Sequence, residues 1–158
     1  MAAQIYQRLD LATNQLETAI GLFIGGHDRF SVITLAGAAD GILTQLVSNR
    51  GEETFTEILS REDDDKTMTL SRMGSHVNTI LFINELKHID KDGDGYVVMD
   101  AEECALATIL KALANFVTLR GNEVGFVQAF LLWVRLNLDP HRYNVNCDPN
   151  WKPTPRKE

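Results

Sequence analysis

Apolar residues recur at steps of three and four along most of the chain, which is the spacing of one face of an α-helix. The first such stretch covers about residues 4–24 and ends at two consecutive glycines, because glycine readily takes the left-handed conformation at a helix C-cap. The second covers about residues 29–48, and Asp28 stands in front of it as the expected N-cap. These stretches predict the first two helices.

Three more stretches carry the same periodicity, at about residues 68–89, 101–120 and 123–138. At the start of the second of these, Asp100 with Glu103 three residues later makes a capping-box pattern. The last stretch is apolar on most sides, which is typical of a helix at the centre of a bundle. We therefore expect this last helix to be central.

The segment between the second and third helices, residues 50–67, is polar and acidic, and it allows a short additional helix near 54–60. The chain has 158 residues, which suits one domain with a real core. The pattern thus predicts an all-α fold, a single-domain bundle of five main helices over residues 1–140. Residues 141–158 hold three of the four prolines and are predicted to form an extended or partly disordered C-terminal tail.

The formal net charge is −7, from 15 basic and 22 acidic residues, and the acids concentrate in residues 52–65 and 85–103. Acidic stretches repel phosphate backbones, so nucleic acid is not an expected partner. The two cysteines are too few for a disulfide framework or a zinc site.

No membrane association is expected from the pattern. The longest nearly apolar stretch, residues 126–134, is far shorter than the roughly 18 residues that a membrane span needs. The N-terminus lacks the basic region and apolar run of a signal peptide. The sequence therefore predicts a cytoplasmic protein.

The chain between the third and fourth helices resembles an EF-hand calcium loop. Asp90, Asp92 and Asp94 stand at the first, third and fifth loop positions, where carboxylates bind calcium. Gly95 follows at the position of the sharp turn, and Tyr96 stands where a backbone carbonyl is the ligand. These residues predict calcium as the one candidate cofactor.

The end of the loop departs from the calcium-binding pattern. Ala101 stands where the bidentate glutamate belongs, and Val98 stands where a water-mediated ligand belongs. Glu102 comes one residue late, so it is a ligand only if the loop shifts by one position. We expect weak binding, with a Kd on the order of 10⁻⁴–10⁻³ M. The alternative is a plain corner between two helices, for which Asp-Gly turn chemistry is common.

Asn84 and His88 are a second candidate site, for a ligand. They are four residues apart and would share one face of the predicted third helix. The alternative for His88 is a structural one, because a cationic side chain is favoured near the C-terminus of a helix.

Four short stretches of the chain are similar to a mainly bacterial family of uncharacterised small helical proteins. The stretches are residues 15–23, 34–39, 87–90 and 130–133. Most of them are packing motifs, so the resemblance implies a fold more than a function. Family members often carry a histidine where this chain has Ile33, and they lack a good calcium loop.

The arrangement of helices is also broadly similar to the HEPN superfamily of helical bundles, several of which are RNases. Their active site pairs an arginine with a histidine four to six residues later on a helix. Here only His141 has such a partner, Arg135. Pro140 lies between them and would break the helix that sets their geometry, and Leu136 replaces the polar residue expected next.

These observations predict a non-catalytic helical interaction or regulatory domain, with a protein partner or self-association as its mode of action. One alternative is a calcium-binding protein that uses a single degenerate EF-hand-like loop at 90–102. The other is a degenerate HEPN-type RNase or nucleotide-binding domain.

Overall fold

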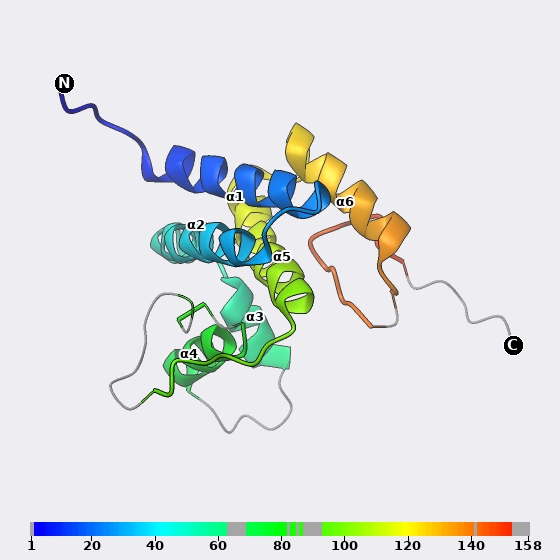
Figure 1. The fold of residues 1–158 in the computed structure, drawn as a ribbon. Coiled ribbons are helices and arrows are strands. Elements are labelled where there is room, and N and C mark those ends of the chain that lie inside the picture. The colour runs from blue at the N-terminus through cyan, green and yellow to red at the C-terminus, as the bar shows by residue number, and fades with distance from the viewer. Residues whose placement is uncertain are drawn as a thin grey trace, which may run out of the picture.

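A computed structural model of the chain describes residues 2–62, 69–81, 83–84, 86, 93–140 and 142–152. Regular structure in this part of the chain is entirely helical, without a strand (Figure 1). The helices are α1 (Arg8–Ile24), α2 (Arg29–Asn49), α3 (Phe55–Glu62), α4 (Leu70–Ile80), α5 (Ala101–Arg120) and α6 (Gly125–Asn137). The predicted all-α bundle is confirmed, and α3 is the short additional helix expected near 54–60.

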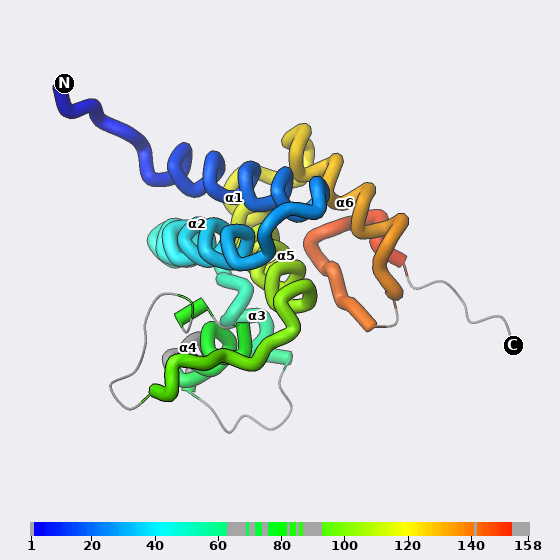
Figure 2. The backbone as a smooth tube through the Cα atoms, viewed as in Figure 1, coloured from blue at the N-terminus to red at the C-terminus, as the bar shows by residue number. Residues whose placement is uncertain are grey.

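The central helix is α5, not the last helix of the chain. It shares its most extensive interface with α2, and α1 packs against both (Figure 2). The prediction of a central α6 is wrong, because Leu132 and Leu136 on its outer side are 51% and 75% exposed. The helix α6 carries apolar residues on most of its sides, but the bundle buries only the side with Val127, Phe130 and Val134.

The helix α4 is shorter than the periodicity predicts. After Ile80 the backbone turns, and the amide of Ile83 donates to the carbonyl of Asn78 at 3.2 Å. The turn places Ile83 against α2, where a Cβ added at Gly37 would lie 2.9 Å from Ile83 Cγ2. The described residues 81, 83, 84 and 86 are therefore not helical as predicted, and residues 87–89 of the predicted helix lie outside the described residues.

The interface between α2 and α5 contains a buried ion pair. Lys111 of α5 donates from Nζ to Oδ2 of Asp40 in α2, and each side chain is only 5% exposed. Moving a charge out of water costs on the order of several kcal/mol, so each of these groups depends on the other. Asn115, one turn further along α5, donates to Asp40 Oδ1 at 2.9 Å and to Thr44 Oγ1 at 3.1 Å.

The same asparagine fixes the start of α3. Oδ1 of Asn115 accepts a hydrogen bond from the amide of Phe55 at 2.9 Å. Thr54 and Glu57 form a capping box, in which Glu57 Oε2 accepts from Thr54 N at 2.7 Å and Thr54 Oγ1 accepts from Glu57 N at 3.2 Å. The hydrogen bonds from the amide and hydroxyl of Thr54 hold the pKa of the Glu57 carboxyl below its ordinary value.

By length and composition α2 could cross a membrane, since its mean hydropathy is 1.5 over an 18-residue stretch. Of that stretch, 44% is buried inside the bundle. Core helices of folded proteins pass the same test, so this is weak evidence for a membrane span.

We expect Lys111→Met to lower the free energy of unfolding by about 3–5 kcal/mol, because Asp40 would stay buried without its partner. The matched control is Arg61→Ala, whose ion pair with Glu53 joins side chains that are 63% and 42% exposed. That change should cost about 1 kcal/mol or less. Urea denaturation measures both values.

The double variant Asp40→Leu/Lys111→Met removes both charges and should recover most of the loss. If Lys111→Met costs no more than the surface control, the pair does not hold α2 against α5.

Candidate functional site

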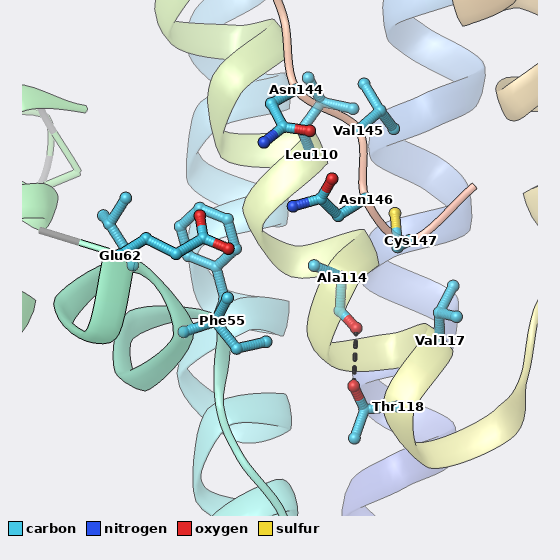
Figure 3. A pocket seen from close by; sticks show the side chains of 12 residues that line it. Phe55, Glu62, Leu110, Ala114, Val117, Thr118, Asn144, Val145, Asn146 and Cys147 are labelled. Carbon is cyan, nitrogen blue, oxygen red and sulfur yellow. Dashed lines mark hydrogen bonds between the residues drawn. The ribbon is translucent and has the colours of Figure 1, made fainter. Parts of the chain in front are cut away.

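A cavity of about 360 Å³ lies between α3, α5 and the segment 142–152, which follows α6 (Figure 3). Its walls come from three separate parts of the chain. The lining residues are Phe55, Ile58, Leu59, Glu62, Leu110, Ala114, Val117, Thr118, Asn144, Val145, Asn146 and Cys147. Most of these side chains are apolar, which is the usual composition of a small-molecule site.

The two helical walls follow from helical spacing. On α3 the lining residues fall at steps of three and four from Phe55 to Glu62. On α5 they follow the same steps from Leu110 to Thr118. One face of each helix therefore points into the same space. The hydroxyl of Thr118 donates to the carbonyl of Ala114 at 3.1 Å, so its hydrogen-bonding demand is met within α5 (Figure 3).

The third wall, the segment 142–152, contains no helix and is held by polar anchors. Arg135 of α6 donates to Oδ2 of Asp148 at 2.5 Å, and the Asp148 side chain is only 1% exposed. The indole of Trp151 donates to the carbonyl of Tyr143 at 3.1 Å, and the hydroxyl of Tyr143 donates to Glu103 Oε2 at 2.7 Å. The pKa of Tyr143 is raised by burial and then by Glu103. These contacts fix the wall against α5 and α6.

Polar groups gather at one side of the cavity. The carboxylate of Glu62 and the amides of Asn144 and Asn146 face the space between α3 and the third wall (Figure 3). Cys147 lies in the same wall, and burial, with a smaller effect of Asp148, raises the pKa of its thiol to about 11. The thiol is therefore protonated at neutral pH, and it is a poor nucleophile.

The acidic corner, residues 90–102, is described from residue 93 on, and one of its predicted calcium ligands contacts α2. Glu102 turns to α2, where its carboxylate accepts from Nε and Nη2 of Arg29 at 2.5 and 3.1 Å. Arg29 also lies 4.4 Å from the centre of the Phe23 ring and donates to the Phe23 carbonyl at 3.0 Å. The Glu102 side chain is 61% exposed, so this is a surface ion pair and contributes little free energy.

The other predicted calcium ligands are only partly described. Asp90 and Asp92 lie outside the described residues. Asp94 Oδ1 accepts from the amide of Tyr96 at 3.0 Å, and Gly95 has a φ of +82°, which suits the expected sharp turn. Tyr96 is 84% exposed. Across the described ranges no three His, Cys, Asp or Glu side chains come close enough to hold a metal ion.

Each of the other predicted residue pairs has one member outside the described residues. Asn84 lies exposed in the turn after α4, and His88 lies outside the described residues. Arg135 is engaged with Asp148, and its predicted partner His141 also lies outside the described residues.

Comparison of the chain with protein-family models, with curated proteins and with solved structures gives no match.

The sequence pattern missed the cavity. One wall of the cavity could have been found on α3, where Phe55, Ile58 and Leu59 are apolar residues at helical spacing in a segment that is otherwise polar and acidic. No local pattern marks Asp148 as a buried anchor, because its partner Arg135 stands 13 residues earlier.

The raised pKa of Cys147 predicts slow alkylation by iodoacetamide. At about pH 8 we expect the rate to be on the order of 100-fold below that of a free thiol, because the thiolate is the reacting form. The rate should rise about tenfold per pH unit until the pH nears the thiol pKa of about 11. Peptide mapping by mass spectrometry measures this at Cys147 itself.

Arg135→Ala should raise the alkylation rate of Cys147 several-fold. The change removes the partner of the buried Asp148, so the segment that carries Cys147 is held less firmly and the thiol is more exposed. Arg120→Ala is the control, since its contact with Asp10 is 3.9 Å long and exposed. If Cys147 of the unmodified protein reacts as fast as a free thiol, the segment 142–152 is not packed against α5 and α6 as described.

Calcium binding stays a prediction, and calorimetry at millimolar calcium tests it. We expect a Kd on the order of 10⁻⁴–10⁻³ M. The heat of calcium binding should disappear in Asp92→Asn and remain in the exposed control Glu52→Gln. If Glu102 is a ligand, Arg29→Gln should strengthen binding by releasing it. Heat that does not depend on Asp92 would end the calcium hypothesis.

Proposed function

We propose that this protein is a non-catalytic binding module that holds a small, largely apolar molecule in the cavity between α3, α5 and the segment 142–152. The observation that carries the proposal is the cavity itself, about 360 Å³ in volume and walled by three parts of the chain.

The size of the cavity suits a small molecule. Pockets for small ligands measure roughly 300–1,000 Å³, and this one falls at the low end of that range.

The polar groups of the cavity favour binding over catalysis. General acid–base chemistry needs a group whose pKa lies near the working pH. The Cys147 thiol has a pKa of about 11 and stays protonated. No histidine stands among the described lining residues, and Glu62 is the one carboxylate among them. Such a set can orient a ligand but lacks a matched acid and base.

Contacts within the chain hold the walls of the cavity. Asn115 fixes the start of α3 through the amide of Phe55, and Arg135 fixes the third wall through Asp148. A site that is already formed spends little free energy on ordering itself when it binds. This supports a binding role for the cavity.

Fluorescence titration with the neutral apolar probe N-phenyl-naphthylamine tests the proposal. We expect saturable binding that Ala114→Trp weakens at least about tenfold, because the indole would fill the space that α5 lines. The matched control is Ala129→Trp, the same change at an exposed position of α6, which should leave binding unchanged.

Circular dichroism and urea unfolding show whether Ala114→Trp is folded. If it is not, Leu59→Gln is the second variant, because Leu59 stands at the edge of the cavity and is 36% exposed. Probe binding that neither variant weakens would refute the proposed function.

A further inference from the structure

The polar side of the cavity carries a negative charge and no positive one. Glu62 is the one acidic side chain among the described lining residues, and none of them is Lys, Arg or His. No ion pair joins Glu62 to another residue in the described part of the chain. Glu62 is exposed and lines the cavity.

One further feature reinforces this negative potential. In the sequence three more acids follow Glu62 directly, within a chain of net charge −7. An anionic ligand would be repelled from this end of the cavity, and a cationic one attracted.

Two asparagines line the cavity across from Glu62. The amides of Asn144 and Asn146 turn their nitrogens toward α3 (Figure 3), and neither amide bonds to another described side chain. A primary ammonium has three donors and no acceptor, so a carboxylate satisfies part of it, and the two amides add acceptors once each rotates to present its oxygen. Phe55 lines the same cavity, and its ring is a further partner for a cation.

We propose that the ligand of this cavity is a small amphipathic cation, a primary ammonium carried on an aromatic or alkyl body. This rests on the proposed function and names the chemistry of its ligand. The ammonium binds Glu62, with Asn144 and Asn146 as additional acceptors. The body lies against the apolar walls of α3 and α5.

Most of the affinity comes from the apolar body, because Glu62 is exposed to solvent. An exposed ion pair is worth little and is screened by salt. The charge should therefore change affinity by about fivefold, enough to select a cation but not enough to bind one without the body.

Three molecules with the same aromatic body separate these contributions: naphthylmethylamine, naphthalenemethanol and naphthoate. Displacement of N-phenyl-naphthylamine at neutral pH gives their affinities. We expect the amine to bind about fivefold tighter than the alcohol and the carboxylate to bind weakest. Raising the salt concentration should shrink the advantage of the amine and leave the alcohol unchanged.

Glu62→Gln should bring the amine to the affinity of the alcohol, without weakening the alcohol. Glu17→Gln removes the same charge from an exposed position of α1 outside the cavity, and it should preserve the advantage of the amine. This control separates a local effect of Glu62 from the loss of net charge.

The outcomes distinguish the two proposals. If amine and alcohol bind equally in the unmodified protein, or if Glu62→Gln leaves their ratio unchanged, the cation proposal is overturned and the cavity remains a binding site. If none of the three displaces the probe, and Ala114→Trp does not weaken the probe either, the proposed function itself fails.

Discussion

Asp40 and Lys111 are charged side chains that lie inside the core, on the two helices with the most extensive interface of the bundle. A buried charge is tolerated only where a partner and further hydrogen bonds compensate for the lost water. That requirement restricts how α2 can lie on α5, because a small slide or rotation would separate the two groups. Asn115 donates a hydrogen bond to Asp40, and its Oδ1 accepts a hydrogen bond from the amide of Phe55. The position of α3 therefore depends on the same network that joins the central helices.

The cavity is a consequence of this arrangement. The helix α3 is tethered at its start, so its apolar face stands opposite α5 at a distance set by Asn115 and not by direct packing alone. The segment 142–152 closes the third side, because the buried carboxylate of Asp148 requires Arg135 of α6. Each of two walls is thus held by a polar interaction with another helix, Phe55 with Asn115 of α5 and Asp148 with Arg135 of α6.

The acidic corner shows how tertiary contacts compete with a local motif. Asp94 and Gly95 keep the turn chemistry of a calcium loop. Glu102, the residue that would have to stand in for the missing glutamate, pairs with Arg29 instead. Arg29 is held in turn by the ring and carbonyl of Phe23. In the described structure an arginine from the start of α2 thus pairs with this carboxylate.

The sequence by itself determined the helices, because their periodicity and caps are local. Asp28 and Asp100 cap α2 and α5 as predicted, and their side chains accept from the third residue that follows. The end of α4 and the outer place of α6 escaped prediction, because both depend on what packs against them. Periodicity shows that α6 has apolar residues all round, and only the bundle decides which of them it covers.

Only the tertiary structure decided the site. Lys111 and Asp40 stand 71 residues apart in the sequence, and Asn115 and Phe55 stand 60 apart. No local sequence pattern pairs residues over such separations. Within their own helices Asp40, Lys111 and Asn115 look like ordinary polar residues. The cavity joins α3, α5 and the segment 142–152, so its shape and its one-sided charge exist only once the buried network has brought these parts together.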